Sequence, residues 1–151
     1  MGDVMERLAE VVPAERLLSG EAIADDYTHD ECLTVDAVAP DVVVRPESTD
    51  EVAEILRFAD AERIPVTARG AGTGLSGSAI PGASSILVSF ERMNRVLEVD
   101  PENHVAVVQP GVRLHELDEV VAGHGLVYPV FPGEYSASLG GNVATNAGGM
   151  R

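Results

Sequence analysis

The sequence contains no lysine and only one cysteine among its 151 residues. Without lysine there is no Gly-Lys-Ser/Thr stretch, so the chain cannot carry the phosphate loop of Walker-type nucleotide-binding proteins. The single Cys32 cannot form an intramolecular disulfide, which agrees with a cytoplasmic protein. No apolar run approaches the roughly 18 residues of a membrane span, and the acidic, polar N-terminus is unlike a signal peptide. We therefore expect a cytoplasmic protein with no membrane span.

Positive charge is also scarce. The chain has 25 acidic residues against 10 basic ones, all of them arginine, and a formal net charge of −15. This balance argues against nucleic acid and anionic membranes as partners, because both bind basic surfaces. Repulsion among the carboxylates is screened by salt, so the composition predicts an acidic, halophilic protein of a salt-rich cytoplasm. An anionic cofactor would have to be held mainly by backbone N–H groups and one or two arginines.

Glycine is abundant where positive charge is not. Residues 69–77 read Arg-Gly-Ala-Gly-Thr-Gly-Leu-Ser-Gly and follow a short apolar run. Such a loop exposes a row of N–H groups that can curl around an anion, and this pattern is typical of a phosphate cradle. A second glycine-rich stretch, residues 140–149, ends the sequence. Together the two stretches suggest one long ligand that carries a pyrophosphate.

The first loop has other interpretations. Gly72, Gly74 and Gly77 have the spacing of the Rossmann fingerprint, which requires a helix to open at the third glycine. Pro81 and Gly82 follow too soon for a helical pattern to develop, so the Rossmann interpretation fails. A glycine loop that only turns tightly, without a ligand, remains an alternative from this stretch alone.

The length fits one domain with a real core. Apolar positions between Val4 and Leu18 predict a short helix interrupted at Pro13, and residues 1–39 are expected to form an N-terminal helical lead-in.

From residue 40 the pattern predicts a β-α-β unit. The apolar run 42–45 is a candidate buried strand. Ser48 stands three residues before Glu51, the spacing of a capping box, and a helix is expected over 49–63. A second strand over 65–68 would form a parallel pair with the first, with the helix as the crossover.

The second half predicts the remaining elements. These are a strand over 86–89, a hairpin of strands over 96–99 and 104–109 joined by a type I turn, and a helix over 113–121. Ser138 can cap a short helix whose positive N-terminus would lie close to a phosphate. The sum is an α+β fold with its glycine-rich loops gathered on one side.

Few other residues suggest chemistry. The four histidines are scattered and lack the spacing of a metal site, so no metal is expected and no catalytic residue is assigned. The pairs of adjacent acids are best interpreted as solvated surface in so acidic a chain. Arg69 enters the first loop, and we favour cofactor contact over a structural ion pair for it.

The order of these motifs resembles the FAD-binding (p-cresol methylhydroxylase-type) domain of the vanillyl-alcohol oxidase superfamily, in its glycolate oxidase and D-lactate dehydrogenase branch. The matching stretches are residues 27–30, 44–52, 64–66, 69–77, 108–112 and 139–149. The resemblance implies that residues 40–151 are the N-terminal portion of that domain, its first subdomain, without the C-terminal subdomain and the substrate cap.

Carried over by position, the first loop is similar to the family's clamp for the pyrophosphate and ribityl chain; its residues are Arg69, Gly70, Ala71, Gly72, Thr73, Gly74, Leu75, Ser76 and Gly77. The turn of Pro110, Gly111 and Val112 resembles the one beside the adenine half. Contacts to the pyrophosphate and the polar edge of the flavin are implied for Pro132, Ser138, Gly140, Gly141, Asn142, Thr145 and Asn146. Thr73 stands where several relatives have a histidine that bonds the flavin, so non-covalent FAD is expected.

The implied activity is oxidation of a small D-2-hydroxy acid, of the glycolate or D-lactate type, by hydride transfer to flavin. The alternative is a non-catalytic flavin- or nucleotide-binding module, or a truncated remnant, completed by another chain. A homo-oligomer or a completing chain is the partner expected besides the substrate.

Overall fold

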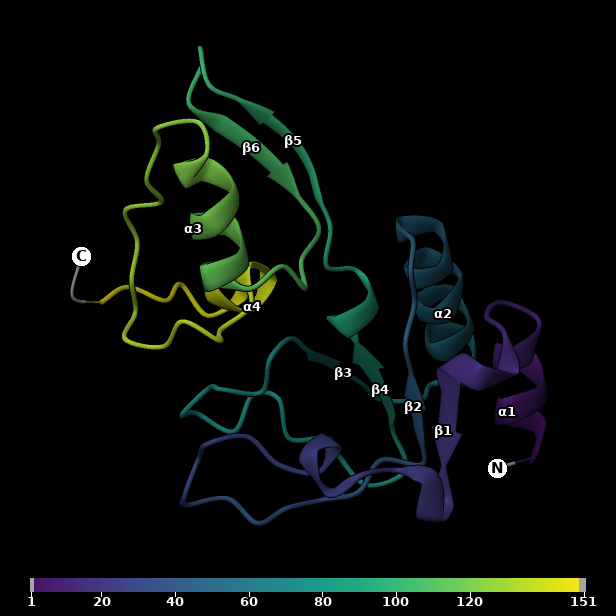
Figure 1. Ribbon diagram of the computed structural model, residues 1–151. Helices are drawn as coiled ribbons and strands as arrows, with labels where there is room; N and C mark the ends of the chain where they lie inside the picture. Colours follow the sequence, from purple (N-terminus) through teal and green to yellow (C-terminus); the bar gives the residue numbers. More distant parts are fainter. Residues whose placement is uncertain (1, 150–151) are drawn as a thin grey trace.

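The computed structural model describes residues 2–149, with side chains from Val4 onward, so Met150 and Arg151 of the expected domain lie outside the described residues. The chain folds as expected into a mixed α+β structure (Figure 1). Its helices are α1 (Gly2–Ala9), α2 (Thr49–Glu62), α3 (Leu114–Ala122) and α4 (Leu139–Ala144). Its strands are β1 (Leu17–Ser19), β2 (Val42–Val44), β3 (Val66–Arg69), β4 (Ile86–Ser89), β5 (Val96–Asp100) and β6 (Val105–Val108).

Four strands form a sheet in the order β1-β2-β4-β3. Strand β1 is antiparallel to β2, whereas β2, β4 and β3 are parallel to one another. The β-α-β unit is therefore present. We expected β2 and β3 to be direct neighbours, but β4 lies between them. The burial pattern agrees: every residue of β2 and β4 is buried, while β3 is partly exposed at the edge.

The N-terminal region has the expected short helix and its interruption at Pro13, but its end at Leu17 and Leu18 is a strand and not helical. Helix α1 ends at Ala9, a single 3₁₀ turn (Ala14–Arg16) follows Pro13, and Leu17–Ser19 is extended as β1. Leu17 and Leu18 pair with Val44 and Val43, so they supply the partner that one side of β2 needs. Pairing with a distant strand outweighs the local helical spacing of the leucines.

Helix α2 occupies nearly the range expected for it. The Ser48 hydroxyl accepts the N–H of Glu51 at 3.2 Å and caps the helix. The Glu51 carboxylate, however, accepts the N–H of Glu47 at 2.7 Å, one residue before the position of a standard capping box. The helix ends at Arg63, whose φ of 57° is left-handed.

A first hydrophobic core joins α1 and α2 to the sheet. Leu8, Val42, Val44 and Ile55 are fully buried in it, with Ile86 at 1 % exposure. Burial of these side chains is the main source of stability in this half of the molecule.

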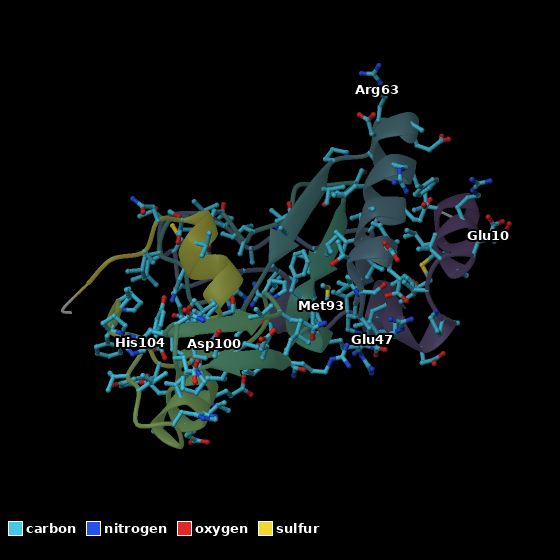
Figure 2. All side chains as sticks on the ribbon, turned by 90° about the horizontal axis from the view of Figure 1, so that it is seen from above. Glu10, Glu47, Arg63, Met93, Asp100 and His104 are labelled. Carbon is cyan, nitrogen blue, oxygen red and sulfur yellow. The ribbon has the colours of Figure 1, made fainter. Side chains whose placement is uncertain are left out.

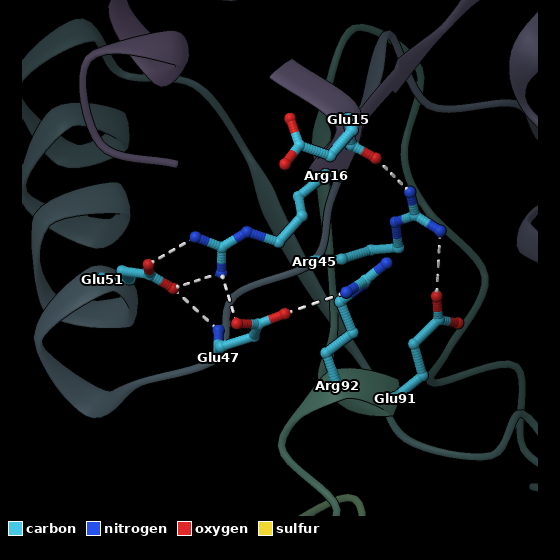
Figure 3. A network of polar contacts seen from close by, with 7 residues as sticks. All are labelled: Glu15, Arg16, Arg45, Glu47, Glu51, Glu91 and Arg92. Carbon is cyan, nitrogen blue, oxygen red and sulfur yellow. Dashed lines mark hydrogen bonds and ion pairs between the residues drawn. The ribbon is translucent and has the colours of Figure 1, made fainter. Parts of the chain in front are cut away.

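An ion-pair network ties the N-terminal region to the start of α2 (Figure 3). Arg16 is 7 % exposed and donates to both oxygens of Glu51, at 2.7 and 2.9 Å. Glu47 lies 3.7 Å from Arg16 and 2.9 Å from Arg92, in the 3₁₀ turn after β4. Bidentate pairs of this kind fix geometry as well as charge, so Arg16 ties the turn directly before β1 to the start of α2.

A second core lies under the β5–β6 hairpin, which is antiparallel as expected. Val112, Leu114, Leu117 and Val121 are buried there against the hairpin, and helix α3 spans nearly the expected range. The hairpin loop reaches beyond the predicted turn to His104, which has a φ of 56°.

The two halves join at Met93, which Figure 2 shows between the sheet and the hairpin. Met93 is 5 % exposed, and its carbonyl accepts the N–H of Gly111 at 2.7 Å. A Cβ on Gly111 would lie 2.1 Å from the Phe90 carbonyl oxygen, so only glycine allows this close approach.

Candidate functional site

The first glycine loop begins the connection from β3 back to β4. Parallel neighbouring strands require a long crossover, and residues 70–85 provide it without any helix. The absence of a helix after Gly77 in this described segment agrees with our rejection of the Rossmann interpretation. Gly72 and Gly77 have φ values of 74° and 75°, which favour glycine.

The N–H groups of this loop are free of protein partners. Within residues 2–149, no N–H from Ala71 to Ser78 donates to a protein acceptor, whereas the next one, of Ala79, donates to Asp30. Backbone donors in folded proteins are nearly always paired, with water or a ligand if not with protein. This row of donors is therefore available to an anion.

Helix α4 of the second glycine stretch is different. The expected Ser138 cap is present, with the N–H of Gly141 donating to its hydroxyl at 3.3 Å. The N–H of Leu139 donates to Val112 and that of Gly140 to Pro110, both at 2.8 Å. The first N–H groups of α4 thus already have protein acceptors, and a phosphate could not use them without displacing these bonds.

The two glycine-rich stretches meet at one point. A Cβ added to Gly70 would lie 2.1 Å from the hydroxyl oxygen of Ser138. Because real Cβ atoms essentially never approach another atom so closely, Gly70 is the residue that lets the first loop touch the cap of α4.

A cavity of about 1130 Å³ opens between the two stretches. This volume exceeds the roughly 300–1,000 Å³ of typical small-molecule pockets and suits an extended dinucleotide. Twelve of the residues expected to bind the cofactor line it: Gly70, Ala71, Gly72, Thr73, Gly74, Leu75, Ser76, Pro132, Ser138, Gly141, Asn142 and Thr145.

Asn142 lines this cavity and carries an unpaired, buried side-chain donor. The residue is 9 % exposed, and its Nδ2 atom is buried without a hydrogen-bond partner among the described residues. A buried unsatisfied amide carries a desolvation penalty, which a ligand acceptor in the cavity would remove.

Residues 40–151 match the family described as the FAD binding domain, which amounts to more than half of the chain. The chain belongs to this family. FAD is accordingly the cofactor for which the fold provides a site, and the free loop donors, the glycine contact and Asn142 fit a ligand with a diphosphate.

The relatives to which the chain is similar are longer proteins named as oxidoreductases, dehydrogenases and oxidase subunits. An uncharacterised FAD-linked oxidoreductase of Mycobacterium tuberculosis is 53 % identical over 151 residues, 100 % of this chain and 33 % of the relative. A D-lactate dehydrogenase of Anaerostipes hadrus is 43 % identical over 99 % of this chain and 31 % of its own length. The glycolate oxidase subunit GlcD of Bacillus subtilis is 37 % identical over 99 % and 32 %. The chain therefore spans about a third of the length of these relatives.

Solved structures share the fold. Alkyldihydroxyacetonephosphate synthase aligns with a TM-score of 0.88 at 22 % identity, over 99 % of this chain and 30 % of its own. p-Cresol methylhydroxylase aligns with a TM-score of 0.81 at 20 % identity, over 96 % and 28 %. The p-cresol methylhydroxylase-type fold that the sequence motifs predicted is confirmed.

Seven of the expected residues do not line the cavity of the FAD binding domain: Arg69, Gly77, Pro110, Gly111, Val112, Gly140 and Asn146. The turn of residues 110–112 lies behind α4, where a Cβ on Gly140 would lie 2.6 Å from the Cβ of Pro110. Gly111 instead lines a pocket of about 100 Å³ on the other side of the Gly70–Ser138 contact. Val112 is fully buried in the second core. Arg69 lies under the first loop and donates to the His29 carbonyl at 2.6 Å.

Sequence reasoning missed two acidic residues of the cavity wall, Glu31 and Glu134. Glu134 accepts the N–H of Ser136 at 2.7 Å, and this hydrogen bond holds the pKa of its carboxyl below its usual range. Glu31 follows directly after the motif at residues 27–30, and this position is the feature of the sequence that could have identified it as a site residue. Carboxylates repel a diphosphate, so the wall at Glu134 suits the uncharged or hydroxyl-bearing parts of a cofactor.

The rest of the described chain offers no second centre. Residues 2–149 hold no group of three or more His, Cys, Asp or Glu side chains that could bind a metal ion. No helix in this range is long and apolar enough to cross a membrane.

Proposed function

We propose that this chain is the N-terminal portion of an FAD-dependent oxidoreductase that oxidises a small D-2-hydroxy acid of the glycolate or D-lactate type. The relatives named D-lactate dehydrogenase and glycolate oxidase subunit support this substrate class. When bound, FAD supplies the hydride acceptor. Residues that the longer relatives have beyond the matched third, or a completing chain, would supply the substrate base and clamp.

The observation that carries the proposal is the row of free N–H groups from Ala71 to Ser78 along a large cavity. In a chain with a net charge of −15, backbone donors are the main source of positive potential for a diphosphate. We assign the diphosphate to this loop rather than to the start of α4, whose N–H groups are already engaged.

The second stretch would orient the rest of the cofactor. Asn142 and Thr145 line the same wall, and in this proposal the unpaired Nδ2 of Asn142 donates to the cofactor. The Thr145 hydroxyl donates to the Gly141 carbonyl at 2.9 Å. Ser138 and Gly141 keep this wall within reach of Gly70. Asn146 follows the end of α4 and does not line the cavity, and Pro110–Val112 and Gly140 act by holding α4 in place.

FAD is held without a covalent bond in this proposal. Thr73 lines the cavity, and its hydroxyl is no nucleophile for flavin attachment of the kind that a histidine provides. Flavin should therefore leave the protein completely in denaturing precipitation, and coloured precipitate would contradict this point.

The net charge of the chain also bears on where the protein works. The acidic composition supports a protein of a salt-rich cytoplasm, so binding experiments belong in concentrated KCl.

Titration of the chain with FAD and with riboflavin, followed by flavin fluorescence, tests the binding part of the proposal. FAD should bind and riboflavin should bind at least tenfold more weakly, because it lacks the diphosphate. Anaerobic addition of D-lactate or glycolate to the FAD-loaded chain, joined with the part that supplies the substrate base and clamp, tests the substrate class. The flavin absorbance should bleach with these acids and not with L-lactate. Equal binding of the two flavins would contradict the role given to the loop N–H groups.

A further inference from the structure

The segment at residues 29–31 holds the first glycine loop through three hydrogen bonds. Arg69, at the start of the loop, donates to the carbonyl of His29 at 2.6 Å. In its middle, Gly74 accepts the N–H of Glu31 at 2.9 Å. At its end, Ala79 donates its N–H to the Asp30 carboxylate at 3.3 Å. Three consecutive residues thus fix three points of the loop.

Arg69 fills the space beneath the loop. Its side chain is 8 % exposed, and a Cβ on Gly72 would lie 2.1 Å from its Nη2 atom. The guanidinium therefore packs directly against Gly72, at the residue whose φ is 74°. Burial lowers the pKa of Arg69, while the nearby carboxylates of Asp26 and Asp30 act in the opposite direction.

Asp30 holds the opposite end of the loop. Its side chain is 5 % exposed, and its two oxygens accept the N–H groups of Cys32 at 3.0 Å and Ala79 at 3.3 Å. Burial of a carboxylate without such donors would cost free energy of folding. The position therefore requires a side chain with two acceptor oxygens.

The contacts of residues 29–31 leave the row of loop N–H groups unused. The segment engages the side chain of Arg69, the carbonyl of Gly74 and the N–H of Ala79, and no N–H from Ala71 to Ser78 donates to it. Neither Asp30 nor Arg69 lines the cavity. Residues 29–31 also lie outside the matched range of 40–151, although Figure 1 shows the N-terminal loops beside the crossover that follows β3.

We propose that Asp30 and Arg69 are positioning residues that fix the first loop with its N–H groups toward the cavity, although neither touches the cofactor. This inference deepens the proposed function and rests on it for the identity of the ligand. It makes the region before residue 40 part of the cofactor site.

The first test reads the loop without any cofactor. Amide exchange measured by NMR in Arg69→Lys should become about tenfold faster or more for Glu31 and Ala79, because the loss of one buried contact loosens the other two. Asp30→Asn should do the same for Glu31, since an amide offers only one acceptor oxygen. Arg57→Lys and Asp36→Asn, at exposed positions, are matched controls and should leave both amides unchanged.

The second test reads the ligand. We call the contacts of Asp30 and Arg69 with the loop the brace. In both Arg69→Lys and Asp30→Asn, FAD affinity should fall about tenfold or more, whereas riboflavin affinity should change less than twofold, because only FAD presents a diphosphate to the loop. Amides of Val43 and Leu87 in β2 and β4 should keep their protection, which separates this effect from general unfolding.

The outcomes are distinguishable. Unchanged exchange of Glu31 and Ala79 in both variants would overturn the brace, as would an equal loss of FAD and riboflavin binding. Failure of the wild-type chain to bind FAD would overturn the proposed function. The exchange rates of the Glu31 and Ala79 amides would then show on their own whether Asp30 and Arg69 hold the loop.

Discussion

Gly70 and Ser138 touch, although 68 positions separate them in the sequence, and their contact joins the two glycine-rich stretches around one cavity. Gly70→Ala would place a methyl group 2.1 Å from the Ser138 hydroxyl and push the stretches apart. We expect FAD affinity to fall at least tenfold and the free energy of unfolding to drop by about 1–3 kcal/mol, the usual range for overpacking. Calorimetric titration and urea unfolding measure the two effects.

Two further variants make this prediction specific. Gly70→Ala combined with Ser138→Gly removes the opposing hydroxyl and should recover most of the lost affinity, because glycine is a tolerable N-cap. Gly82→Ala has open space around the new Cβ and should change neither quantity. Failure of the double variant to recover would show that the contact is not the cause.

The unpaired Asn142 amide predicts a loss of FAD binding with almost no change in stability. Asn142→Ala removes a buried donor without a partner, so the free energy of unfolding of the cofactor-free protein should change by less than about 1 kcal/mol. FAD affinity should nevertheless fall about tenfold, since a hydrogen bond to a charged or polar ligand is lost. A variant that lost stability but not FAD affinity would assign Asn142 to the core instead.

The Arg16–Glu51 pair predicts a pH dependence of stability. Hydrogen bonds from Arg16 hold the pKa of Glu51 below its ordinary value of about 4.3. A depressed carboxylate pKa gives stability that is fully present above the ordinary value and lost as pH falls through the lower, folded-state value. Glu51→Gln should therefore lower the free energy of unfolding by about 1–2 kcal/mol at pH 7, and this difference should shrink below about pH 4.

Urea unfolding from pH 3 to 7 checks the prediction for this pair. Glu54→Gln, in the same helix, is the matched control, because Glu54 pairs with Arg57 at the exposed surface and should show no measurable effect. A difference at Glu51 that stayed constant over this pH range would contradict the electrostatic origin.

The net charge of −15 predicts that salt stabilises the fold. Thermal unfolding midpoints should rise from 0.1 to 2 M KCl, as counterions screen the repulsion among carboxylates. Much of the rise should occur at the low end of this salt range, where added salt shortens the Debye length most. Midpoints that did not change with salt would count against the salt-rich habitat.

Much of the fold followed from local patterns. The strand at Val42–Val44, the cap at Ser48 and the hairpin were predicted because each signal acts over a few residues. The place of β4 between β2 and β3, and the strand at Leu17–Ser19, were not, because they depend on pairing between distant segments.

The site shows the same division. Glycine spacing located both walls of the cavity, whereas Arg69 was expected to contact the cofactor and instead packs beneath Gly72. Its position depends on His29, forty residues earlier, and local sequence carries no sign of that contact. The engaged N–H groups of α4 likewise depend on the distant turn at Pro110 and Val112.

The most direct test of this account is the visible absorption spectrum of the chain in concentrated KCl after incubation with FAD and gel filtration. The account predicts flavin bands near a one-to-one ratio with protein, and their loss in Gly70→Ala. A colourless wild-type protein that is folded by circular dichroism would contradict the claim that these two glycine-rich stretches form the FAD site.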